Sequence, residues 1–268
     1  MNYHNDEWIM ERLQEHYEEA LEYFPEDRIV CLILQGSQNY GLDVPNSDID
    51  TKLIVTPTFE DIAMNRQPIS TTHVRDNNEH IDFKDIRLYI QTFRKQNLNF
   101  LEILFSPYKI VNPMYEEQWN RLIEANEAIT RYNPFRSIKS MKGIAMEKYH
   151  AMEHEYPSKI DIINKYGFDC KQLHHLLRVE EYIERYINGE PYKDCLISNQ
   201  SEYLKAVKQH GYYTLDEARK LADTSLTHIL NMHDEFVEQV SDKVDPEVDA
   251  LLDDVQLNIM KIAIQHEL

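Results

Sequence analysis

The stretch that decides the fold is residues 32–50, which read Leu-Ile-Leu-Gln-Gly-Ser-Gln-Asn-Tyr-Gly-Leu-Asp-Val-Pro-Asn-Ser-Asp-Ile-Asp. It starts inside an aliphatic run, residues 28–35, whose lack of polar alternation is typical of a strand covered on both faces. Gly36 and Ser37 end that strand, and a turn-rich loop leads to a second strand predicted over residues 48–55. The predicted order is strand, Gly-Ser turn, loop, Ser-Asp-Ile-Asp, strand.

Asp48 and Asp50 stand two residues apart at the start of the second predicted strand. Because side chains alternate between the faces of a strand, both carboxylates and Lys52 are expected on one face and apolar residues on the other. Carboxylates about 5 Å apart repel by roughly 3 kcal/mol at an effective dielectric near 20, so water or a cation must relieve the pair. Mg²⁺ does so directly, because it prefers hard oxygen ligands, and a pair of metal ions suits displacement at phosphorus.

Glycine is scarce, with 6 in 268 residues, whereas an average usage of about 7% would give roughly 19. Gly36 and Gly41 nevertheless lie within six residues of each other, so we expect this pair to serve the backbone geometry. Gly36 lets a phosphate approach the backbone, and Ser37 offers a hydroxyl and an amide of the kind that hold anions. Either motif alone is usually a plain turn or a solvated loop, but together they predict a site for phosphate and metal.

The rest of the chain changes from strands to helices. A third strand is predicted over residues 80–84, where polar and apolar residues alternate, and an extended piece over residues 109–111. Helices are predicted over residues 6–24, around residues 86–93, from residue 114, and then over 137–155, 169–188, 215–240 and 246–267. The pattern predicts an α+β half followed by an α-helical half, divided near residue 130.

Charge and composition limit the classes of function. The formal charge is −19, and a surface this acidic repels nucleic acid unless its basic residues gather on one face. The three cysteines, Cys31, Cys170 and Cys195, are scattered and predicted to be buried thiols. No apolar run approaches the ~18 residues of a membrane span, and the first 20 residues lack the basic start and apolar centre of a signal peptide. We expect a soluble, cytoplasmic protein.

With Gly36-Ser37 followed by Asp48-Ile49-Asp50, the sequence resembles the DNA polymerase β-like nucleotidyltransferase superfamily. Two further segments, residues 97–105 and 171–178, are similar to one branch, the predicted nucleotidyltransferases of the RNA repair pathway polymerase-β family. This resemblance implies an α+β fold: a small mixed β-sheet nucleotidyltransferase domain with a polymerase β-like palm over residues 1–130, then an α-helical domain over residues 131–268.

The resemblance also implies an activity. A member of this family would transfer an NMP from an NTP, such as ATP, to an acceptor hydroxyl and release pyrophosphate. Asp48, Asp50 and a third carboxylate would hold two Mg²⁺ ions, with Mn²⁺ as an alternative, and Gly36 and Ser37 would hold the triphosphate. An RNA end is the acceptor that the branch implies.

The third carboxylate is a choice between Asp82 and Asp85. Asp82 lies between Ile81 and Phe83 in the alternating strand, which matches the apolar-acidic-apolar pattern of the superfamily. Asp85 lies where a helix begins and is suited to be its N-cap. The prediction takes Asp82, which would bridge a metal and orient or deprotonate the attacking hydroxyl. In an acidic protein Asp82 is also explained as an ordinary exposed strand residue.

Four basic residues complete the predicted nucleotide-binding set. Lys52 shares a strand face with the aspartates and is suited either to neutralise phosphate or to pair with them. Lys171, His175 and Arg178 follow the i, i+4, i+7 spacing of one helix face. They would bind the triphosphate or an acceptor phosphate, or form a solvated face paired with Glu181 and its neighbours.

Two other functions stay open at this point. Because the charge of −19 disagrees with an RNA acceptor, the acceptor is alternatively a protein or a small molecule, as in antitoxin-like or antibiotic-modifying enzymes. A catalytically silent nucleotide-binding module is the other alternative, and the retention of three candidate carboxylates argues against it.

Overall fold

The computed structural model describes residues 2–268, and the contacts within it divide the chain into two compact units. Unit 1 is discontinuous: it comprises the chain up to Asn133 together with Val244–Leu268. Unit 2 is Pro134–Lys243. Among the described residues, no helix is both long and apolar enough to cross a membrane.

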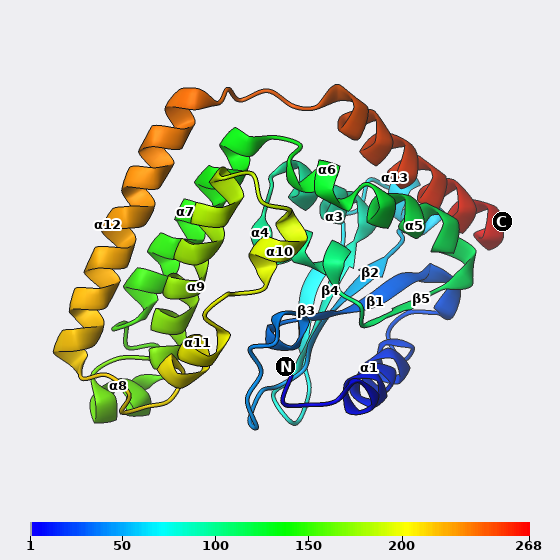
Figure 1. Cartoon of the computed structure of the whole chain (residues 1–268). Helices are drawn as coiled ribbons and strands as arrows, with labels where there is room; N and C mark the ends of the chain where they lie inside the picture. Colours follow the sequence, from blue (N-terminus) through cyan, green and yellow to red (C-terminus); the bar gives the residue numbers. More distant parts are fainter. Residues whose placement is uncertain (1) are drawn as a thin grey trace. The chain divides into compact units, whose positions relative to one another are not determined.

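Unit 1 contains a five-stranded sheet and its covering helices (Figure 1). Its strands are β1 (Ile29–Gln35), β2 (Asp50–Val55), β3 (Ser70–Val74), β4 (His80–Asp85) and β5 (Lys109–Val111). Its α-helices are α1 (Asp6–Ala20), α2 (Phe59–Ala63), α3 (Ile86–Arg94), α4 (Leu98–Leu101), α5 (Glu116–Glu124), α6 (Asn126–Thr130) and α13 (Pro246–Glu267). Short 3₁₀ helices are η1 (Glu26–Arg28), η2 (Ser37–Tyr40), η3 (Glu102–Phe105) and η4 (Pro113–Tyr115).

The sheet is mixed. Its order is β3-β4-β2-β1-β5, with β2 and β4 parallel and the other neighbours antiparallel. One face carries Leu32, Leu53 and Phe83, which form a buried core with the apolar side of α1. The opposite face carries polar side chains near the ends of β2 and β4. The predicted α+β fold with a small mixed sheet is confirmed, and the polar face is the part that bears on function.

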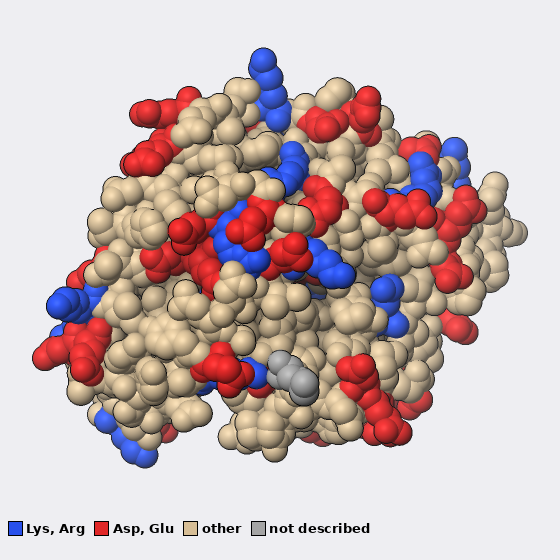
Figure 2. Space-filling view, viewed as in Figure 1, with Lys and Arg blue, Asp and Glu red and all other residues tan. Residues whose placement is uncertain are grey.

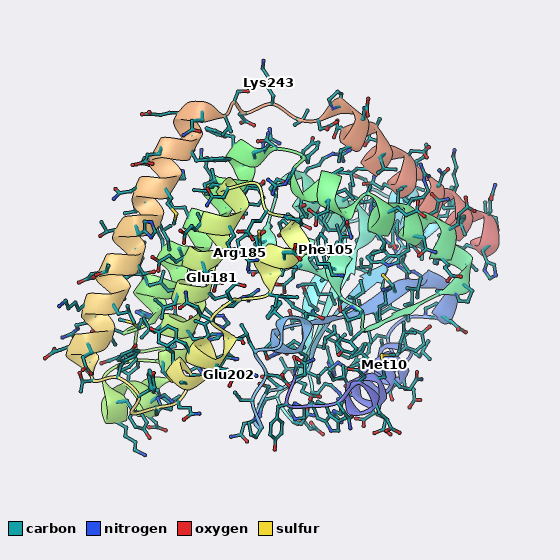
Figure 3. The ribbon with its side chains drawn as sticks, viewed as in Figure 1. Met10, Phe105, Glu181, Arg185, Glu202 and Lys243 are labelled. Carbon is teal, nitrogen blue, oxygen red and sulfur yellow. The ribbon has the colours of Figure 1, made fainter. Side chains whose placement is uncertain are left out.

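Unit 2 consists of helices within the described residues. They are α7 (Pro134–Ala151), α8 (Ile160–Tyr166), α9 (Cys170–Ile187), α10 (Tyr192–Leu196), α11 (Ser201–Val207) and α12 (Leu215–Gln239), of which α7, α9 and α12 contact one another. On α9, Arg185 lies 3.8 Å from Glu181, which also accepts a hydrogen bond from the backbone N–H of Asn199 at 2.6 Å (Figure 3).

The C-terminal helix α13 differs from the prediction. The sequence predicts one helical domain over residues 131–268, whereas the contacts place α13 in unit 1, beside α3 and α5. Arg94 on α3 bonds to Asp249 at 2.8 Å and to Asp253 at 2.6 Å. Periodicity predicts that residues 246–267 form a helix, but it does not say which core their apolar side joins.

Candidate active site

The two motifs of the decisive stretch meet at one end of the sheet. Gln35, the last residue of β1, pairs with Asp50, the first residue of β2. The Gly36-Ser37 turn therefore lies beside the segment that leads into β2. Ser37 Oγ is 3.5 Å from Ser47 Oγ, and Gln38 Nε2 donates to the backbone oxygen of Asp48 at 2.8 Å. Residues that are ten positions apart in the sequence thus form one local structure.

The glycines serve the backbone, as predicted. Gly36 has φ 122° and Gly41 has φ 68°, and side chains other than hydrogen rarely permit such angles. The two glycines bracket η2, so the chain leaves β1 in a tight turn and brings Ser37 back toward Ser47.

β2 begins at Asp50 and not at Asp48, which corrects the predicted strand. Before Asp50, the backbone bonds to side chains instead of to a neighbouring strand. Gln38 donates to the carbonyl of Asp48, and the Ile49 N–H donates to Glu79 Oε1 at 3.2 Å. Ile49 is fully buried. Asp48 is consequently an exposed residue just before the strand, next to Asp50.

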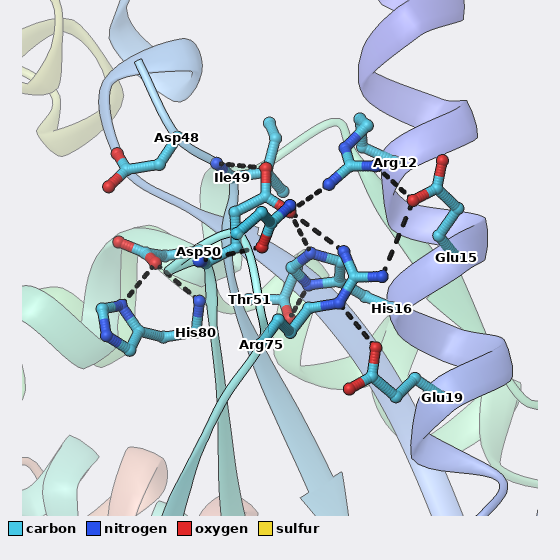
Figure 4. A network of polar contacts seen from close by, with 12 residues as sticks. Arg12, Glu15, His16, Glu19, Asp48, Ile49, Asp50, Thr51, Arg75 and His80 are labelled. Atoms are coloured by element: carbon cyan, nitrogen blue, oxygen red, sulfur yellow. Dashed lines mark hydrogen bonds and ion pairs between the residues drawn. The ribbon is translucent and has the colours of Figure 1, made fainter. Parts of the chain in front are cut away.

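The Asp48 and Asp50 carboxylates repel each other. Burial, and then the charge of Asp48, raise the pKa of Asp50 above its ordinary value. His80 opposes this by donating to Asp50 Oδ1 from its backbone N–H at 3.1 Å and from its ring Nδ1 at 3.0 Å. Both carboxylates point away from Arg12 and Arg75 (Figure 4). Within residues 2–268, every hydrogen bond to the Asp50 carboxylate goes to Oδ1, so its Oδ2 remains for a ligand.

The two candidates for the third carboxylate have different surroundings. Asp82 lies on the polar face of β4, opposite Lys52 of the parallel strand β2, and Lys52 Nζ is 3.0 Å from Asp82 Oδ2. Asp85 is buried and caps α3: it accepts the Arg87 N–H at 2.8 Å and pairs with the Arg87 guanidinium at 2.6 Å. The hydrogen bonds of Asp85 thus serve to cap α3, whereas the Asp82 side chain lies on the same face of the sheet as Asp50.

A second lysine, which the sequence analysis missed, joins Lys52. Lys52 Nζ and Lys84 Nζ lie 4.2 and 4.3 Å from the ring centre of Phe100. Asp82 pairs in register with Lys52 and is two residues before Lys84 on β4. Burial lowers the pKa of Lys84, and the nearby Lys52 charge adds to this while Asp82 opposes it. Lys84 could have been predicted from the alternation of residues in β4, because His80, Asp82 and Lys84 must share one face of a strand.

The fit to a divalent cation is best at Asp48 and Asp50. Burial and then the charge of Asp48 raise the pKa of Asp50, and a bound cation would offset the repulsion between the two carboxylates. Asp82 is occupied by Lys52 and by Thr72, whose Oγ1 is 3.4 Å from Asp82 Oδ1. Over the described part of the chain, no three His, Cys, Asp or Glu side chains are arranged as a metal site. The three predicted carboxylates therefore share a region of the sheet without forming a ready set of ligands.

In unit 2, α9 contains the three residues of the predicted basic face, Lys171, His175 and Arg178. Burial and the charges of its surroundings, which are His174, Arg178, Lys171 and Lys148, hold the pKa of His175 well below its ordinary value. His174 is neutral too, with a pKa lowered to about 3 by burial, and its Nδ1 donates to the Leu204 carbonyl at 2.8 Å. His175 was predicted as part of a basic stripe, but at neutral pH the positive charge comes from the lysines and the arginine.

The family profile that matches this chain is described as "RNA repair pathway DNA polymerase beta family", and it covers residues 6–183. The chain belongs to the RNA repair pathway DNA polymerase beta family. The matched region contains the whole sheet, the Gly36-Ser37 turn, all four candidate aspartates and the basic face of α9. The predicted family is therefore confirmed. A comparison with curated proteins gives no match to the chain.

Membership in the RNA repair pathway DNA polymerase beta family points to nucleotidyl transfer as the class of reaction. The family match covers most of unit 1 and the start of unit 2, up to Ile183 in α9.

Proposed function

We propose that this protein transfers an NMP from an NTP to an acceptor hydroxyl with the help of Mg²⁺, using the end of the sheet where β1 and β2 meet. The observation that carries the proposal is the repelling Asp48 and Asp50 pair beside a turn that only glycine permits at Gly36. A cation would relieve the repulsion of the pair and the turn allows a phosphate close to the backbone, so an NTP with its metal would satisfy both.

The chain's own residues would act as follows. Asp48 and Asp50 hold the cation, which when bound offsets charge on the triphosphate and on the transition state. Gly36 and Ser37 contact the triphosphate. The acceptor oxygen attacks the α-phosphorus, the bond from that phosphorus to the leaving oxygen breaks, and pyrophosphate departs. Asp82 takes the hydroxyl proton, and Lys52 and Lys84 neutralise phosphate charge.

The test is a transfer assay with α-labelled NTPs. Each of the four NTPs is incubated with the protein, Mg²⁺ or Mn²⁺, and RNA, protein or small-molecule acceptors. We expect label on one class of acceptor, none in EDTA and none with Asp50→Asn. The matched control is Glu60→Gln, because Glu60 is an exposed carboxylate of the same unit that pairs with Arg66. Equal labelling by wild-type protein and Asp50→Asn would contradict the proposed site.

For the acceptor, we propose an RNA end, as the family description suggests. The acidic charge is unevenly shared: residues 134–243 carry 15 Lys and Arg against 18 Asp and Glu, a net −3, and the remaining residues carry 13 against 29, a net −16. On the face drawn in Figure 2, basic and acidic side chains are interspersed. RNA binding therefore requires a local group of cations, and the surroundings of His175 contain Lys171, Arg178 and Lys148.

Replacing Lys171 and Arg178 together by Gln tests this acceptor. We expect weaker RNA binding and a slope of log affinity against log salt that falls by about 1 to 2. The control is Lys220→Gln with Lys243→Gln, which removes the same charge from the same unit. An identical slope in both double variants would favour a protein or small-molecule acceptor. Loss of NTP affinity with no RNA binding by any form would make Lys171 and Arg178 a triphosphate clamp.

A further inference from the structure

Glu79 is a buried carboxylate at the centre of a polar network beside the candidate site. Figure 4 labels its partners Arg12, His16 and Arg75. It directly precedes β4 and is 6% exposed. Its two oxygens have separate tasks. Oε2 accepts from four side chains: Arg12, His16 at 2.9 Å, Arg75 at 3.0 Å and Asn77 at 2.9 Å. Oε1 accepts from the backbone N–H of Ile49 at 3.2 Å.

The donors to Oε2 hold the carboxylate from two sides. Arg12 and His16 come from α1, while Arg75 and Asn77 come from the turn between β3 and β4. Arg75 is itself fixed by Glu19, whose Oε2 is 2.6 Å from Arg75 Nε. The charged donors and hydrogen bonds outweigh burial and lower the pKa of Glu79 to about 2, so the group is ionised at neutral pH. Glu79 is thus a fixed anion that presents one oxygen to Ile49.

The peptide group that Glu79 touches joins Asp48 to Ile49. Its N–H is held by Glu79 Oε1, and its carbonyl is held by Gln38 Nε2 at 2.8 Å. The Ile49 side chain is fully buried in the core of unit 1. With both polar ends of the peptide and the following side chain held, the backbone from which the Asp48 and Asp50 side chains start is restrained: the Asp48 Cα belongs to this peptide unit, and the Asp50 Cα lies one residue beyond it.

We infer that Glu79 is a positioning residue for the two candidate catalytic carboxylates: it orients the Asp48–Ile49 peptide so that Asp48 and Asp50 face one cation. The inference rests on the proposed function for the cation, but the orienting contact is a property of the protein alone. Among the described residues, no hydrogen bond joins the Glu79 carboxylate to Asp48 or Asp50, so this carboxylate acts on them through the backbone N–H of Ile49.

The experiment compares Glu79→Ala and Glu79→Asp with wild-type protein. Glu79→Asp keeps the charge for Arg12 and Arg75 but draws the carboxylate back from Ile49, so it serves if Glu79→Ala does not fold. The control is Glu19→Gln, which disturbs the same network through Arg75 without touching Ile49. The first measurement is hydrogen exchange of the Ile49 amide without metal. The second is Mn²⁺ affinity, measured by electron paramagnetic resonance.

In the Glu79 variants we expect Ile49 exchange to be at least about tenfold faster and Mn²⁺ affinity to fall about tenfold, the lower end of the range known for groups that support metal ligands. Glu19→Gln is expected to change neither. Unchanged Ile49 exchange in a folded Glu79 variant overturns the inference, as does unchanged Mn²⁺ affinity where Asp50→Asn lowers it. If Asp50→Asn does not lower Mn²⁺ affinity, the proposed function fails, while faster Ile49 exchange still supports the orienting contact.

Discussion

Glu79 and Asp50 both lie next to Ile49, yet their pKa values move in opposite directions. Glu79 is buried and receives five donors, so its pKa falls to about 2. Asp50 is half-buried beside Asp48, has His80 as its hydrogen-bonding partner, and its pKa rises. The difference lies in the supply of donors: a carboxylate with a full set stabilises the fold, and one that lacks them beside another carboxylate has capacity for a ligand.

The largest effect should come from Asp48→Asn and Asp50→Asn. Each removes an oxygen charge that the cation needs, so transfer from labelled NTP should fall on the order of 10³-fold or more. Urea unfolding should show equal or slightly greater stability, because a repulsive pair has been relieved. Full activity in either variant, or in EDTA, would show that Asp48 and Asp50 do not hold a catalytic cation and, like Glu79, serve only the structure.

Asp82 and Asp85 extend the comparison to a matched pair on one strand. Asp82→Ala should lower transfer on the order of 10²-fold or more, since it removes the proposed proton acceptor. Asp85→Ala should keep the activity per folded molecule but lose about 1 to 2 kcal/mol of stability, because the cap of α3 is lost. Transfer assays and urea unfolding on both variants separate these roles, and the reverse pattern would make Asp85 the functional carboxylate.

The pH dependence of stability should distinguish Glu79 from Asp50 by sign. The Glu79 pKa is lowered from 4.5 to about 2, so its stabilisation is complete above 4.5 and is lost as pH falls toward 2. The stability difference between wild type and Glu79→Gln should therefore shrink by about 2 kcal/mol from pH 7 to pH 3. The Asp50 pKa is raised, so its ionised form lowers stability at neutral pH and the protein regains this on acidification through that pKa.

Urea unfolding of wild type, Glu79→Gln and Asp50→Asn at pH 7, 5 and 3 measures both signs. If the three proteins lost stability in parallel on acidification, the contrast between the two carboxylates would not hold.

The smallest effect concerns the turn beside the aspartate pair. Gly36 and Gly189 both have positive φ, so replacement by Ala should destabilise both proteins by roughly 1 kcal/mol. Only Gly36→Ala should also weaken NTP binding, by about tenfold or more, because a Cβ there distorts the phosphate-binding backbone. Calorimetry with each NTP and Mg²⁺ measures this, and equal NTP affinity in the two variants would reduce the Gly36-Ser37 segment to an ordinary turn.

Much of the secondary structure in both units could be predicted from the sequence, but the polar network around Glu79 could not. β1, β4, β5 and the helices α9, α12 and α13 were predictable because their apolar residues follow a period. β3 was missed because Ser70–Val74 is an edge strand with mostly exposed side chains and no buried pattern. No sequence pattern indicates the role of Glu79, because that role depends on its contacts with Arg12, Ile49 and Arg75, which only the folded chain brings together.

The discontinuity of unit 1 affects the order in which the protein is made. The ribosome releases residues 1–133 first, then the whole of unit 2, and only afterwards Val244–Leu268, which contains α13. Until then the sides of α3 and α5 that α13 covers stay exposed, and Arg94 lacks Asp249 and Asp253. Because unit 2 is continuous, all of it is made before residues 244–268 complete unit 1. The nascent chain thus passes through a stage in which its second unit is complete before its first.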